Sequence, residues 1–277
     1  MLLAYQPTFF IYGVDGTNPF DLGGHIMKKR YELTVLATLA MGVLAALLRF
    51  LLLSVGYDER NLLIPHHPAS ILCWLATAAA VGLILFFTAR TNPMTQYGKT
   101  FPPSIYPMLG GCFAMAGMII RAVSEFRVTS GILAFACLLS GILGALALLF
   151  ASYCRFTGKR PSCYCMAAAA IYFMLLLVSG YRNWMAQSQP EEYLLALLFH
   201  ICLMLSSFHR AVLDNGGKEL RTYLRYTLLA LFFGIGALPG NRNWLYTASL
   251  VLYLAAELIF LRLPKRKKAV RQSPERQ

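Results

Sequence analysis

Three ionisable residues lie inside runs that are otherwise almost continuously apolar, and they are the first candidates for chemistry. His200 is near the middle of one run, and Glu257 is in the second half of another. Ionisable groups inside a membrane are costly and are functional candidates by default. Arg225, one turn into the neighbouring run at a similar depth, is the expected ion partner of Glu257.

Two other interpretations of these residues remain open. Glu257 could form a proton or cation site, alone or as a His200–Glu257 pair that relays protons or binds a ligand. His200 by itself is expected to be neutral and hydrogen-bonded between helices.

Four arginines form a second candidate group, because each falls at or near the same end of an apolar run: Arg49, Arg121, Arg182 and Arg242. Two of them belong to similar turns, Tyr181-Arg-Asn-Trp184 and Asn241-Arg-Asn-Trp244. Guanidinium groups suit phosphate and carboxylate, so a ring of these arginines could face an anionic ligand or a lipid headgroup. The simpler expectation is that each extends to the interface and pairs with a nearby acid, as Arg121 would with Glu125.

Motifs for catalysis or cofactor binding are missing from the sequence. There is no nucleotide-binding loop, no HExxH and no GxSxG. Cys154, Cys163 and Cys165 could supply thiolates, but zinc sites usually show CxxC-type spacing. We therefore expect no catalytic residues, no metal and no cofactor, and we expect the seven cysteines to be free thiols.

The composition indicates which elements must position these residues. The chain of 277 residues is 58% apolar and only 13% charged, whereas soluble domains carry about 25% charged residues. The apolar runs are about twenty residues long, which is the length that crosses a bilayer as a helix. They are continuous rather than alternating, which disfavours membrane strands. The sequence therefore predicts an all-α, polytopic transmembrane helical bundle.

We expect eight spans in one bundle. They are Tyr31–Val55, Ala69–Ala89, Ile105–Arg121, Thr129–Tyr153, Ser162–Gly180, Glu191–Leu213, Thr222–Leu238 and Trp244–Leu263. The linkers are short, so neighbouring spans should pack as four antiparallel hairpins. The arginine at one edge of each hairpin suggests a hairpin repeat about an axis along the membrane normal.

The basic residues predict the orientation. The N-terminus and the even-numbered linkers together hold 19 of the 25 lysines and arginines. Cytoplasmic loops carry such an excess, so both termini should face the cytoplasm of a multi-pass protein in the cell membrane. The net charge of +13 is explained in this way, and no nucleic-acid partner is expected because no basic stripe is interleaved with aromatic residues.

The chain divides into three parts along its length. Residues 1–26 contain no run long enough to span, and Met27-Lys-Lys-Arg30 leads directly into the first span. We interpret residues 1–26 as a translated leader from a misassigned start, with Met27 as the natural start; a genuine cytoplasmic tail is the alternative. Residues 27–263 form the bundle, and residues 264–277 form a basic cytoplasmic tail.

The stretch "YRNWMAQSQPEEYLLALLFHICLMLSSFHRAVLDNGG" resembles a group of poorly characterised multi-spanning membrane proteins from clostridia-like bacteria. In that group a tryptophan-containing outer turn leads into an apolar helix of this type. The resemblance implies a bacterial cytoplasmic (inner) membrane location and supplies no activity.

Two functions from different classes follow from these features. The first is a non-enzymatic sensor, accessory or assembly module that contacts membrane lipids and a membrane protein partner or a second copy of itself. The alternative is a small-solute transporter or permease with a path near His200 and Glu257. A shared water-accessible cavity at these residues would favour transport, whereas sealing of each residue by its neighbours would favour the module.

Overall fold

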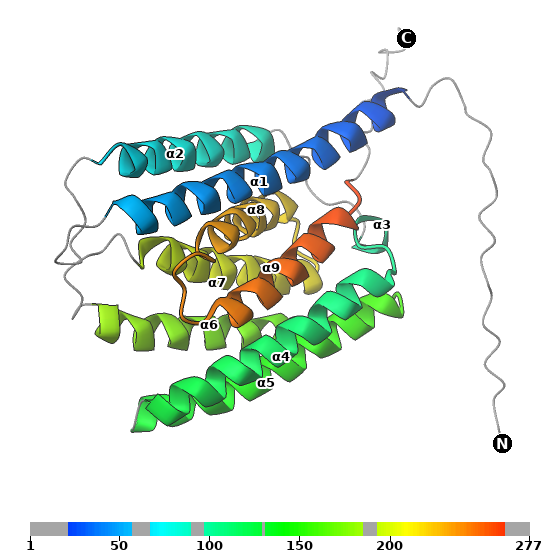
Figure 1. The fold of residues 1–277 in the computed structure, drawn as a ribbon. Coiled ribbons are helices and arrows are strands. Elements are labelled where there is room, and N and C mark those ends of the chain that lie inside the picture. The colour runs from blue at the N-terminus through cyan, green and yellow to red at the C-terminus, as the bar shows by residue number, and fades with distance from the viewer. Residues whose placement is uncertain (1–21, 57–66, 90–96, 129–130, 185–192, 264–277) are drawn as a thin grey trace, which may run out of the picture.

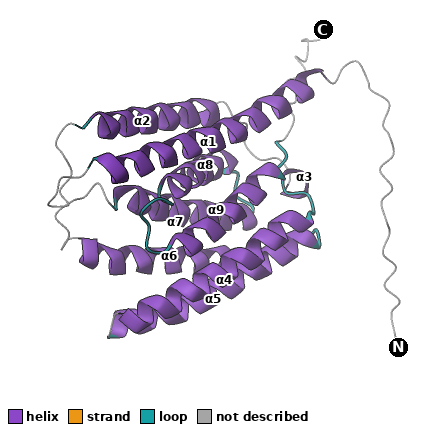
Figure 2. Ribbon diagram, in the orientation of Figure 1, coloured by secondary structure: helices purple, strands orange, loops and turns teal. Residues whose placement is uncertain are grey.

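A computed structural model describes residues 22–56, 67–89, 97–128, 131–184 and 193–263. Within these ranges the chain forms nine helices and no strand (Figure 2). The helices are α1 (Leu22–Val55), α2 (Pro68–Ala89), α3 (Tyr97–Thr100), α4 (Ile105–Val128), α5 (Ile132–Phe156), α6 (Cys163–Trp184), α7 (Leu194–Asp214), α8 (Leu220–Gly236) and α9 (Trp244–Ile259).

Six of these helices are long and apolar enough to cross a membrane. The qualifying segments contain 19 to 25 residues and belong to α1, α2, α4, α5, α6 and α7. Side chains such as Phe135 and Leu143 on α5 point outward and are more than half exposed, as expected for a surface that faces lipid. The prediction of a helical, multi-pass membrane protein is confirmed at this level.

The remaining helices are shorter. α8 has 17 residues and α9 has 16, so each is about 24–26 Å long against a hydrocarbon core of about 30 Å. From Thr227 to Gly236 every residue of α8 is buried. α8 is therefore surrounded mainly by protein, and α3 is a single turn that precedes α4.

Several helix ends differ from the expected span ends, including the start of α1, which lies at Leu22 and not at Tyr31. α4 continues to Val128 instead of ending near Arg121, because Arg121 and Glu125 form an ion pair across one helical turn at 2.6 Å. α9 ends at Ile259, four residues before the expected end. Residues 1–21 and 264–277, which include most of the proposed leader and all of the basic tail, lie outside the described residues.

From α4 to α9 each helix packs against the next in sequence, and the contact of α9 with α4 completes the arrangement. α5 contacts α6, α7 contacts α8, and α9 contacts α4, so these six helices close into a ring. α1 and α2 pack on α8 from outside this ring. Figure 1 shows α1 and α2 along one side of the bundle and α4 and α5 along the opposite side.

Small residues allow two of these helix pairs to approach closely. A Cβ atom added to Gly110 of α4 would lie 3.0 Å from the Cα of Tyr253 in α9. A Cβ atom added to Gly144 of α5 would lie 3.3 Å from the Cα of Ala169 in α6. These glycines therefore mark close contacts between helices.

Candidate functional site

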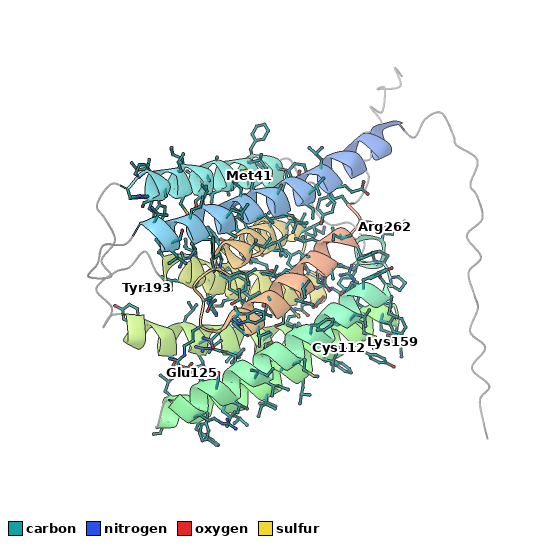
Figure 3. All side chains as sticks on the ribbon, viewed as in Figure 1. Met41, Cys112, Glu125, Lys159, Tyr193 and Arg262 are labelled. Atoms are coloured by element: carbon teal, nitrogen blue, oxygen red, sulfur yellow. The ribbon has the colours of Figure 1, made fainter. Side chains whose placement is uncertain are left out.

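Four charged side chains meet at one end of the bundle, and we call Arg155, Arg210, Asp214 and Glu257 the charge cluster. α5, α7 and α9 all end there, because each is separated from the next by one antiparallel helix. Arg155 is the penultimate residue of α5, Asp214 is the last residue of α7, and Glu257 precedes the end of α9 by two residues. Figure 3 places Lys159 and Arg262 at this same end, and Tyr193 at the opposite end.

Glu257 is the centre of the charge cluster. Its Oε2 accepts hydrogen bonds from Nη1 of Arg155 and, at 3.2 Å, from Nη1 of Arg210. Arg155 also donates from Nη2 to the carbonyl of Phe260 at 3.0 Å. Arg155, Arg210 and Glu257 are only 1%, 4% and 2% exposed. Buried charges of this kind persist when they are paired and hydrogen-bonded, and this carboxylate has two cationic partners.

Arg210 extends the charge cluster to a second carboxylate. Its Nε donates to Oδ1 of Asp214 at 3.2 Å, one helical turn away. Its Nη2 donates to the hydroxyl of Tyr97 at 2.9 Å. Each of the three guanidinium nitrogens therefore has an acceptor, and the two arginines balance the two carboxylates. Nε of Arg155 and Oδ2 of Asp214 are buried without a hydrogen-bond partner in the described part of the chain.

Aromatic rings close the charge cluster on the side of α3. Cζ of Arg210 lies 3.7 Å from the centre of the Phe101 ring, and the Tyr97 and Phe101 rings are 4.9 Å apart. The backbone N–H of Arg262 donates to the carbonyl of Thr100 at 2.9 Å, which fixes this turn to the end of α9. Burial raises the pKa of the Tyr97 phenol above its usual range, so Tyr97 contacts Arg210 as a neutral hydroxyl. Desolvated cation–π contacts strengthen such an arrangement.

Chemically, this arrangement is an electrostatic cross-link. It joins α5, α7 and α9 to each other and to the α3 turn, and its carboxylates are occupied by arginines. A general acid or base needs access to a reacting group, whereas Glu257 is 2% exposed and bound on one oxygen by two cations.

The prediction that Glu257 pairs with Arg225 is wrong. Glu257 binds Arg155 and Arg210, and within the described part of the chain Arg225 has no ion partner. The two residues were expected at similar depth, but depth does not determine the direction of a side chain around its helix. α8 buries Tyr223 and Thr227, and it leaves Arg225 on its less buried face.

His200 is not part of the charge cluster. Its Nδ1 donates to the carbonyl of Ala196 at 2.6 Å, and its ring stacks on that of Tyr246 with centroids 5.7 Å apart. The expected hydrogen bond between helices is thus replaced by one within α7. The His200–Glu257 pair is not formed in this structure, because Glu257 is held by the two arginines.

The four edge arginines make separate contacts where they are described. Arg121 pairs with Glu125 at 2.6 Å, which confirms that prediction, and Glu125 also accepts a bond from Ser179 at 3.0 Å. Nε of Arg49 donates to the carbonyl of Pro239 at 3.2 Å. Arg242 is exposed, and the side chain of Arg182 lies outside the described residues. The described contacts of these arginines thus give no common anion site.

One of these arginines also borders a small cavity. The cavity has a volume of about 30 Å³ and is lined by Arg49, Leu52, Ser70, Cys73, Trp74, Thr77, Leu194 and Leu195. A space of this size holds one or two water molecules. It lies between α1, α2 and the start of α7, away from the charge cluster.

Most residues of the charge cluster were not predicted from the sequence. Arg155 and Arg210 counted only as basic residues at the cytoplasmic ends of spans, and Asp214 and Tyr97 were not considered. One signal was present: Arg210 and Asp214 are four residues apart at the end of an apolar run, the spacing of an ion pair on one helix face. The meeting of α5, α7 and α9 at one point left no such local signal.

Potential metal ligands and cysteines were also placed by the structure. Among the described residues, no group of three or more histidines, cysteines or carboxylates could hold a metal ion. The seven cysteines are free thiols, of which Cys137, Cys154 and Cys202 are buried.

Comparisons with protein family models, with curated proteins and with solved structures find no match to this chain. The function is therefore inferred from the chain's own residues.

Proposed function

We propose that this protein is a non-enzymatic integral membrane module: a sensor, accessory or assembly subunit of a bacterial cytoplasmic membrane. The observation that carries the proposal is that both deep ionisable residues have protein partners, with Glu257 buried and His200 partly buried. Glu257 is enclosed by two arginines, and His200 donates to its own helix and stacks on Tyr246. A module that works through helix packing needs such internally satisfied groups, whereas a solute path needs groups that water can reach.

The proposed topology has eight spans in four antiparallel hairpins, with both termini in the cytoplasm. The pairwise packing of α1 with α2, α4 with α5, α6 with α7 and α8 with α9 supports it. The shortness of α8 is compatible with a span because its surroundings are mainly protein, so it need not match the lipid thickness. The charge cluster would then lie at the cytoplasmic end, beside Lys159 and Arg262.

Partners follow from this proposal. A module of this kind acts on other molecules in the bilayer, so we expect membrane lipids and a membrane protein partner, or a second copy of the chain, to bind its apolar outer surface. That surface includes the outward faces of α1, α2 and α5, where large side chains such as Leu33, Phe86 and Phe135 are exposed.

The experiment that tests the proposal screens small solutes for thermal stabilisation of the purified full-length protein. The wild type is compared with His200→Ala and Glu257→Gln, and each ligand-induced shift is measured against the variant's own baseline. Glu219→Gln is the matched control, because Glu219 is a half-exposed carboxylate that pairs only with His209. The module predicts no solute shift that depends on His200 or Glu257. A solute whose stabilisation disappears in either variant and persists in the control would contradict the module and favour the transporter.

A further inference from the structure

Arg225 is a cation without a counter-ion among the described residues. Its Nε is buried and has no hydrogen-bond partner within the described part of the chain, and it takes part in no ion pair there. Its side chain is partly buried, on the less buried face of α8. Water does not reach this nitrogen, and a buried donor without an acceptor is unfavourable. An acceptor from outside the chain would remove that cost.

Three of the carboxylates described near this end of the bundle have other partners. Glu257 binds Arg155 and Arg210, and Asp214 binds Arg210. Glu219 binds His209 at 2.5 Å, and the His209 ring stacks on Tyr226. These carboxylates are therefore engaged on the other faces of α7, α8 and α9, and they leave Arg225 uncompensated.

Arg225 lies close enough to the start of α8 for its side chain to reach the end of the helix. It lies five residues after the start of α8 at Leu220, which is about 7–8 Å along the helix axis. A long arginine side chain reaches back over this distance toward the interface. Arg221, one turn nearer the helix start, is exposed on the same side of α8 and adds a second positive charge at the surface.

We propose that Arg225 binds a phosphate group at the end of α8, and that an anionic phospholipid supplies this group. Basic sites between transmembrane helices bind phosphate-bearing headgroups in this way. The planar guanidinium can donate two parallel hydrogen bonds to one phosphate. The site goes beyond the proposed module function, and it does not depend on which leaflet this end of the bundle faces.

The test measures thermal unfolding of the full-length protein in phosphatidylcholine nanodiscs as the phosphatidylglycerol content rises. We expect phosphatidylglycerol to stabilise the wild type, and Arg225→Gln to weaken this effect about fivefold in apparent affinity. Lys218→Gln is the matched control, because Lys218 is an exposed cation just before the start of α8. This variant should retain the wild-type response.

Two further arms make the outcomes decisive. Inorganic phosphate added to the wild type in phosphatidylcholine alone identifies the source: an Arg225-dependent shift would assign the site to a soluble phosphate, and its absence assigns it to lipid. Arg225→Lys keeps the charge but loses the paired donors, so it should bind more weakly than the wild type even if Arg225→Gln does not fold. A wild-type response in the Arg225 variants that fold, or an equal loss in Lys218→Gln, overturns the proposal.

Discussion

Substitution of Glu257 by glutamine is the most direct test of the charge cluster. Glu257 joins Arg155 and Arg210, and all three side chains are almost fully buried. Glutamine has nearly the same shape but no charge. The variant therefore leaves two guanidinium groups in the interior with Asp214 as the remaining described carboxylate of the cluster.

The distances allow a magnitude to be worked out. At the 3.2 Å that separates Oε2 of Glu257 from Nη1 of Arg210, two unit charges attract by about 5 kcal/mol in an effective dielectric constant of about 20. Desolvation offsets much of this attraction while the pair is intact. Removing one partner leaves the other charge uncompensated, and such changes destabilise by about 3–5 kcal/mol. We expect Glu257→Gln to lower the free energy of unfolding by an amount in this range.

The assay is reversible unfolding of the detergent-solubilised protein by a denaturing detergent, with Glu219→Gln as the control. Glu219 is 48% exposed in its pair with His209, so its loss should change stability by less than about 1 kcal/mol. A double-mutant cycle with Arg155→Gln then isolates the coupling between Arg155 and Glu257. Equal small effects of Glu257→Gln and Glu219→Gln would refute the reasoning, because they would mean that the cluster is hydrated or open in the native state.

Three further predictions concern the cluster's aromatic wall and the helix contacts. Phe101→Leu removes the ring that lies 3.7 Å from Cζ of Arg210. A double-mutant cycle with Arg210→Gln separates the contact between the ring and the cation from the burial lost by the smaller side chain, and this contact should contribute about 1–2 kcal/mol. Gly110→Ala places a Cβ 3.0 Å from the α9 backbone and should destabilise by about 1–3 kcal/mol, whereas Gly82→Ala, where nothing lies within 4 Å, should be neutral or slightly stabilising in the same unfolding assay. The Tyr97 phenol has a raised pKa in the folded state, whereas the phenol of the unfolded chain ionises above about pH 10, so the folded protein loses stability as the pH rises above that value. Tyr97→Phe should reduce this loss of stability at alkaline pH. An unchanged dependence of stability on alkaline pH would contradict the burial of Tyr97.

The expected span ends show how well the continuous apolar runs predict where the helices begin and end. α2 and α5 agree with the predicted spans at both ends to within a few residues, and α1 agrees at its C-terminal end. The reason is that about twenty continuous apolar residues in a membrane must satisfy their backbone groups as a helix. The end of α4 was placed too early, since Arg121 and Glu125 were taken as surface charge that ends a span. In the structure they pair across one turn of α4, and the helix continues about two turns beyond Arg121 to Val128.

The charge cluster and the Arg121–Glu125 pair show which side-chain contacts local residue spacing predicts and which it does not. The depth of Glu257 and the Arg121–Glu125 pair follow from residue spacing on one helix, and both were predicted. The partners of Glu257 did not follow, because Arg155 and Arg210 come from helices more than forty residues away in the chain. Which of several arginines at one depth reaches the carboxylate depends on the rotation of each helix about its axis.

The sequence by itself therefore determined the class of the molecule: a helical, multi-pass membrane protein with few ionisable residues deep in its apolar runs. That result depends on a local quantity, the free energy of transferring each apolar run and its backbone into hydrocarbon. Only the tertiary structure decided that α4 to α9 close into a ring, that Glu257 joins two arginines, and that Arg225 has no counter-ion in the described part of the chain. The physical reason is that packing between helices fixes their rotation and neighbours, and those depend on side-chain shapes from the whole chain at once.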